Sequence, residues 1–75
     1  MDRIEAREDI QAGKPVIRGT RLTVEFILDL LANGWSTDDV VNSYPGVEPD
    51  DVRACLVFAR ERLEEERILP LQSIR

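Results

Sequence analysis

Gly13-Lys14-Pro15-Val16-Ile17-Arg18-Gly19-Thr20-Arg21 is the stretch around which the rest of the chain is organised. Proline disfavours helix at the residue before it, and the two β-branched residues after it suit a short strand. Gly19-Thr20 is typical of a turn, because glycine adopts positive φ without steric cost. We therefore expect an extended arm that bends into the first helix and carries Lys14, Arg18 and Arg21 close together. The alternative is a purely structural turn with solvated charges.

The length and composition predict one small domain. A chain of 75 residues buries only about 60% of its unfolded surface on folding, so its stability is marginal without a partner. The single cysteine excludes an internal disulfide, no apolar run approaches the ~20 residues of a membrane span, and the acidic N-terminus is no signal peptide. We expect a soluble cytoplasmic protein that stays out of the membrane and forms a homodimer.

The charges are segregated along the chain. The net charge is −5, yet residues 14–21 carry three cations and no acid, whereas residues 22–52 carry seven acids and no cation. Such segregation indicates two different faces. The overall acidity argues against non-specific nucleic-acid binding and favours a basic partner.

Start signals predict three helices. Thr23 and Ser36 are candidate N-caps, and Pro49 suits a first helical position. An apolar residue before each start can pack against one in the following turn, and the pairs are Leu22 with Ile27, Trp35 with Val40, and Val47 with Val52. The sequence thus predicts helices over residues 24–33, 37–43 and 49–66. Gly34 ends the first helix, and Pro70 limits the third.

Apolar spacing predicts the faces that these helices bury. The predicted stripes are Val24, Ile27, Leu28 and Leu31 on the first helix, and Val52, Cys55, Leu56, Ala59 and Leu63 on the third. Leu30, Val57 and Phe58 lie outside these stripes, which is the expected mark of a dimer face. The alternative for these three is broad burial in an ordinary three-helix core.

The elements together predict a mostly α, helix-turn-helix-like domain with a short N-terminal β element. Ile4 and Ala6 alternate with charges, so residues 3–10 can hold a strand that pairs with Val16-Ile17, within one chain or between two. We expect a single domain over residues 1–75. It divides into a β arm (1–22), three helices (23–66) and a C-terminal tail (67–75).

Residues suited to catalysis are scarce. The chain has no histidine, no Ser/His/Asp set and no phosphate-binding glycine loop, so we expect neither an enzyme nor a cofactor. Asp38-Asp39 and Asp50-Asp51 could hold a divalent cation, but acids in a first helical turn are explained by the helix dipole. Cys55 lies on the apolar stripe and is expected in the core.

A set of residues spread over the chain resembles the bacterial family called domain of unknown function 433. The set is Gly13-Lys14-Pro15, Ile17-Arg18-Gly19-Thr20-Arg21, Val24, Ile27-Leu28, Leu31, Gly34, Ser36, Tyr44-Pro45, Asp51-Val52 and Ala54. The resemblance covers residues 3–60 and implies a homeodomain-like helical fold with a small β element. Members resemble antitoxins of type II toxin–antitoxin pairs, encoded beside a PIN-like nuclease. Glu48 departs from the family's usual threonine cap, which should loosen the third helix start, and Arg7 replaces a common acidic turn residue.

We accordingly expect an antitoxin-like protein that neutralises a PIN-like nuclease and represses its own operon by binding operator DNA. The alternative is a protein-interaction or dimerisation module without DNA binding, which the acidic block supports. Lys14, Arg18 and Arg21 are the candidate phosphate contacts, and Arg53 is the candidate base contact. Arg18 or Arg21 could instead pair with an acid of the first helix.

The C-terminal tail is the candidate nuclease contact. Its apolar residues follow a run of three glutamates and lie on both sides of Pro70; they are Ile68, Leu69, Leu71 and Ile74. Acids next to apolar residues suit a basic groove on a partner. The alternative is that these four residues pack on the protein's own dimer.

Overall fold

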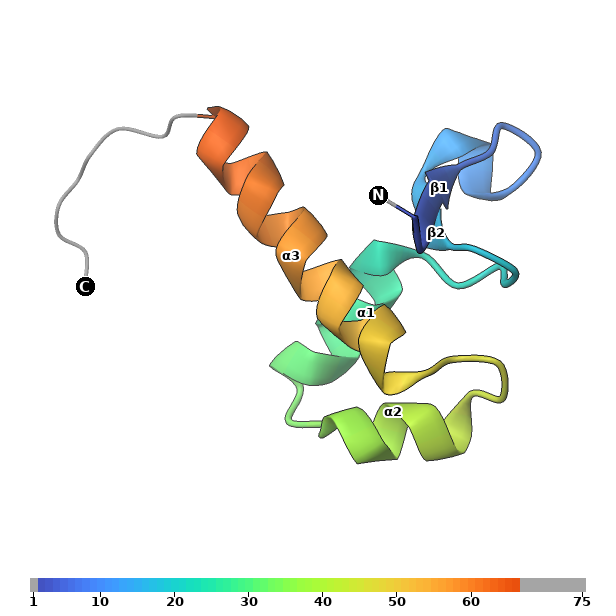
Figure 1. Ribbon diagram of the computed structural model, residues 1–75, viewed down its shortest axis with the longest axis vertical. Helices are drawn as coiled ribbons and strands as arrows, with labels where there is room; N and C mark the ends of the chain where they lie inside the picture. Colours follow the sequence, from blue (N-terminus) through green and yellow to red (C-terminus); the bar gives the residue numbers. More distant parts are fainter. Residues whose placement is uncertain (1, 67–75) are drawn as a thin grey trace, which may run out of the picture.

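The computed structural model describes residues 2–66, which form three helices and a two-stranded hairpin (Figure 1). Strands β1 (Ile4–Ala6) and β2 (Pro15–Ile17) precede helices α1 (Val24–Ala32), α2 (Thr37–Ser43) and α3 (Pro49–Glu66). The predicted mostly helical fold with a short N-terminal β element is therefore confirmed. Within the described range, no helix combines the length and apolar character needed to cross a membrane.

The hairpin forms within the chain. β1 and β2 pair antiparallel, with Ile4 opposite Ile17 and Ala6 opposite Pro15. Ile4 and Ile17 are buried and belong to the same core as the helices. Val16 points to the other face of the strand and is buried as well, so β2 is covered on both sides. Of the two pairings left open by the sequence, the structure has the intrachain one.

The connection between the strands contains a left-handed turn. Gln11, Ala12 and Gly13 have φ values of 52°, 57° and 85°. Only the last of these is a glycine, and the left-handed region costs other residues roughly 1–2 kcal/mol each. The turn is closed by the Gly13 N–H and the Lys14 N–H, which donate to the carbonyls of Ile10 and Gln11.

The helix starts follow the predicted caps. Thr23 accepts a hydrogen bond from the Phe26 N–H at 3.0 Å, which caps α1. Ser36 and Asp39 form a capping box at α2, with bonds of 3.0 Å and 2.9 Å. The Ser36 N–H and hydroxyl hold the pKa of Asp39 below its usual value. α2 and α3 span the predicted ranges, and α1 ends one residue earlier than predicted.

Gly34 ends α1 as expected. Its N–H donates to the Leu31 carbonyl at 3.0 Å, and the Trp35 N–H donates to the Leu30 carbonyl at 3.1 Å. These two bonds define the Schellman motif, which requires a left-handed residue, and Gly34 has φ +97°. The motif turns the chain so that Trp35 packs against the core and lies 6.3 Å from Tyr44, ring centroid to centroid.

One core joins all the helices and strands. Its buried members are Ile4, Ile17, Val24, Ile27, Leu30, Val40, Val47, Val52 and Cys55. Leu30, which the sequence placed outside the α1 stripe, is buried here. For Leu30, the alternative of broad burial in the three-helix core is therefore correct.

The predicted apolar stripe of α3 is wrong for two of its residues, which are exposed rather than buried. Val52 and Cys55 are buried, but Leu56 is 49% exposed and Leu63 is 58% exposed. α3 has 18 residues, twice the nine of α1, so its second half extends beyond the helices that cover its first half (Figure 1). Helical periodicity places residues on a face but does not determine how far a neighbouring helix reaches along that face.

The Schellman motif makes Gly34 sensitive to substitution. No atom lies within 4 Å of a Cβ added there, so the cost of Gly34→Ala arises from backbone conformation alone. We expect a loss of about 1 kcal/mol in the free energy of unfolding. Gly34→Asn should lose less, because asparagine tolerates the left-handed region better. Urea unfolding followed by circular dichroism measures both, and equal losses would contradict the conformational explanation.

Candidate functional site

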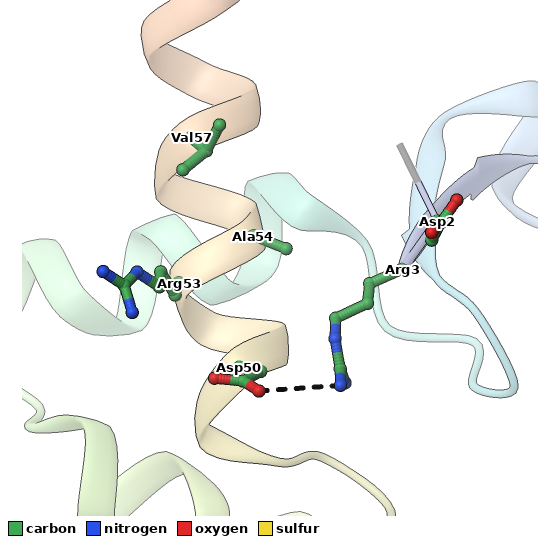
Figure 2. A pocket seen from close by; sticks show the side chains of 6 residues that line it. All are labelled: Asp2, Arg3, Asp50, Arg53, Ala54 and Val57. Carbon is green, nitrogen blue, oxygen red and sulfur yellow. Dashed lines mark ion pairs between the residues drawn. The ribbon is translucent and has the colours of Figure 1, made fainter.

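The start of α3 is an acidic cluster held by one arginine. Arg3, which directly precedes β1, places Nη1 2.9 Å from Asp51 Oδ1 and 3.1 Å from Glu48 Oε1. Its Nη2 lies 3.6 Å from Asp50 Oδ2, and Figure 2 shows the guanidinium reaching across to that carboxylate. The hydrogen bonds that Arg3 donates to Asp51 and then to Glu48 raise the pKa of Arg3 further above its usual value. The first turn of the longest helix is thus tied to the hairpin.

Asp51 is the buried member of this cluster. It is 6% exposed, and its second oxygen accepts a hydrogen bond from the Glu48 N–H at 2.8 Å. This bond is half of a capping box, from the third helical residue back to the N-cap. Glu48, which was expected to loosen this helix start, has its own N–H held by the Asp51 carboxylate. Its carboxylate binds Arg3 instead.

The basic arm is paired with acids. Lys14 Nζ lies 3.1 Å from Glu25 Oε1 on α1, and Arg18 Nε lies 3.5 Å from Glu5 Oε1 on β1. The alternative from the sequence paired Arg18 or Arg21 with an acid of the first helix. It is wrong about the residue, because the cation that pairs with that helix is Lys14. The arm is attached to α1 all the same.

The structure separates the four residues predicted to contact DNA. Lys14 lines a groove at the start of α1, whereas Arg18 lines a different hollow together with Arg3 and Glu48. Arg53 is exposed on the first turns of α3 and points away from the pair of Arg3 with Asp50 (Figure 2). Arg21 is exposed as well, and among the described residues neither it nor Arg53 forms an ion pair. Two of the four cations are therefore available without breaking a pair.

Sequence reasoning did not anticipate an apolar groove of about 600 Å³ between α3 and the start of α1. Apolar side chains line it, namely Pro15, Val24, Leu28, Phe58, Ala59 and Leu63. Lys14, Glu25 and Arg62 line it too, and the Arg62 guanidinium lies 5.3 Å from the centre of the Phe58 ring. Of the three apolar residues outside the predicted stripes, only Phe58 lines this groove, whereas Val24, Leu28, Ala59 and Leu63 come from the stripes themselves.

Two further sequence predictions concern single sites. Cys55 is fully buried, and burial raises the pKa of its thiol to about 11, which agrees with its predicted place in the core. Ile68, Leu69, Leu71 and Ile74, the predicted nuclease contacts, lie outside the described residues. Over residues 2–66, no group of three or more acids, cysteines or histidines is placed to hold a metal ion.

The fold and the site define a class of protein, namely a small three-helix domain with an N-terminal hairpin whose third helix is bound by an arginine. The chain belongs to the family described as protein of unknown function DUF433, which it matches over residues 4–59. It resembles the crystal structure of a DUF433 member protein from Anabaena variabilis, with a TM-score of 0.78 and 22% identity over 87% of this chain and 64% of that one.

A curated relative is similar in sequence. The uncharacterized protein y4eO of Sinorhizobium fredii is 29% identical over 56 residues, which make up 75% of this chain. The matched part is only 25% of that protein, so the chain spans about a quarter of the relative's length. The relative therefore contains much more sequence than the domain described above.

The acidic cluster allows a comparison of neighbouring carboxylates that share one arginine. Asp51→Ala removes a buried hydrogen-bond acceptor at the helix start and should lower the free energy of unfolding by about 1–2 kcal/mol. Asp50→Ala removes an exposed carboxylate from the same guanidinium and should cost about 0.5 kcal/mol or less. Chemical unfolding of both variants measures the difference. Equal losses would show that the cluster acts only as a surface charge network.

Proposed function

We propose that this chain is an antitoxin-like protein of a type II toxin–antitoxin pair, which binds and neutralises a PIN-like nuclease. The observation that carries the proposal is the acidic surface of α1 and α2. Asp29 and Asp38 are exposed there, and neither pairs with a cation in the described part of the chain. A nuclease must attract phosphate, so its active face is basic and complementary to such a surface.

The groove beside α1 supplies the apolar part that a stable interface needs. Protein interfaces combine a buried apolar centre with a polar rim, and charge alone contributes chiefly to association rate. Leu28 and Leu63 line the groove, and Glu25 on the same helix as Asp29 lies at its edge. An acidic surface next to an apolar groove supports a protein partner.

Self-association is part of this proposal. The chain is small, and Leu56 and Leu63 remain exposed on α3. A homodimer that covers part of this helix would add the apolar burial that so small a chain lacks.

The acidic surface can be tested with charge-matched variants. Asp29→Asn with Asp38→Asn should slow association with a PIN-like nuclease partner and flatten the salt dependence of the rate. Glu8→Gln with Glu61→Gln changes the net charge equally at exposed positions outside the block and serves as the control. Stopped-flow fluorescence measures the rates. Equal slowing by both pairs, or a nuclease that the parent chain neither binds nor inhibits, would overturn the proposal.

Autorepression through operator DNA is a second candidate role. The arrangement of α2, a five-residue connection and α3 supports it, since a helix-turn-helix presents its last helix to a groove of DNA. The exposed, unpaired state of Arg53 within the described residues supports it too. The pairing of Lys14 and Arg18 with acids favours the alternative, an interaction module without DNA binding.

The unpaired cations give the clearer DNA test. If the chain binds its own promoter, Arg21→Ala should reduce the slope of log affinity against log salt by about one unit per subunit. Arg53→Ala should instead relax sequence preference. Arg7→Ala removes a cation that Asp9 already pairs, and it is the matched control. Gel-shift titrations in which the parent chain shows no promoter preference at low salt would remove this role.

A further inference from the structure

The apolar groove continues the hydrophobic core along α3 past the point where other elements cover that helix. Cys55 is fully buried, and Phe58, Ala59 and Leu63 continue along α3 at helical spacing on neighbouring positions of the same side. Nothing in the described chain fills the space between these residues and Leu28, and Leu63 is 58% exposed. The groove therefore lacks one apolar segment.

The described chain ends next to this groove. Leu63 lines it, and α3 ends at Glu66, three residues later. The nine residues that follow can span about 30 Å when extended, whereas Phe58 and Leu63 are separated by roughly 8 Å along the helix axis. Pro70 within this segment lacks the backbone N–H that an α-helix uses. The chain is thus long enough to turn back and lie along the groove.

The composition of these nine residues matches the groove. Four of them are Ile or Leu, and the segment carries two arginines and no acid. Residues 1–66 contain all 15 acids and eight of the ten cations, so they carry a net charge of −7 against +2 for residues 67–75. The groove itself is lined by two cations, Lys14 and Arg62, and one acid, Glu25, so the opposite charge is that of the body as a whole. Apolar content favours contact with the groove, and the opposite net charge of the body favours contact within the same molecule.

We propose that residues 67–75 dock into the groove between α3 and the start of α1 of their own chain. This contact goes beyond the proposed function, because it concerns the free protein and does not depend on the partner being a nuclease. It covers Phe58 and Leu63, and it shields the apolar residues of the segment from solvent until another surface displaces them.

Paramagnetic relaxation in the full-length chain tests the contact. A nitroxide is attached at Ser73→Cys, while Cys55 stays in place because burial and its raised pKa protect it from the reagent at neutral pH. The parent chain, treated with the same reagent, should take up no label. The expected result is loss of amide signal at Val24 and Leu28, which lie in the groove but far from residue 73 in sequence.

Two leucines of α3 provide the matched variants. Leu63→Glu places a charge in the groove and should restore the signals at Val24 and Leu28. Leu56→Glu places the same charge on an exposed leucine that does not line the groove, and it should leave the signal loss unchanged. Leu56 is 49% exposed and Leu63 is 58% exposed, so neither substitution opens the core.

Three outcomes would overturn the proposal. The first is signal loss confined to the last turns of α3, which a segment that never enters the groove also produces. The second is equal signal loss for the two glutamate variants. The third is signal loss in a mixture of labelled, NMR-silent chain with unlabelled, ¹⁵N-enriched chain, which would assign the groove to a second copy.

Discussion

The bond between Arg3 and the buried carboxylate of Asp51 is the contact on which the arrangement of hairpin and helices depends. The two residues are 48 positions apart, and their 2.9 Å contact joins the edge of β1 to the first turn of α3. A buried carboxylate that loses its partner is strongly destabilising, whereas a two-stranded hairpin alone is marginal in water. The hairpin and the helix start therefore stabilise each other, even though the sequence presents them as separate local signals.

The features that could be predicted are those decided within a few residues. Thr23, Ser36 and Gly34 act through bonds to neighbours three to five positions away, so their helix ends lie at or within one residue of where the sequence places them. Arg3 was missed because it is one of several charges near the N-terminus, and its role exists only once α3 lies beside β1. The left-handed Gln11 and Ala12 were missed because propensity disfavours that conformation, and only the closed hairpin imposes it. The exposure of Leu63 depends on the length of α1, and the apolar periodicity of α3 carries no information about that length.

The pairing of the arm does not by itself decide between protein and DNA partners. Lys14 and Arg18 sit in exposed ion pairs, and such pairs contribute about 0–1 kcal/mol each. A phosphate could displace Glu25 or Glu5 at that modest cost, and it would gain counterion release in return. The stronger constraint is position, because these two cations line different hollows of the molecule. A single DNA backbone that uses both cations would have to reach both hollows at once, whereas a protein partner can bind at either hollow. The positions of Lys14 and Arg18 therefore suit a protein surface better.

The same magnitudes explain how a segment in the groove could be exchanged for a partner. Ordering the backbone of nine residues costs roughly 9–18 kcal/mol. Four apolar side chains of the segment, together with Phe58 and Leu63, would recover about 1.5–3 kcal/mol each on full burial, which is again roughly 9–18 kcal/mol. The two terms nearly cancel, so a docked segment would be held weakly. A surface that offers it more apolar area, or that covers Leu28 and Leu63 directly, would then displace it without having to unfold the core that joins the helices and strands.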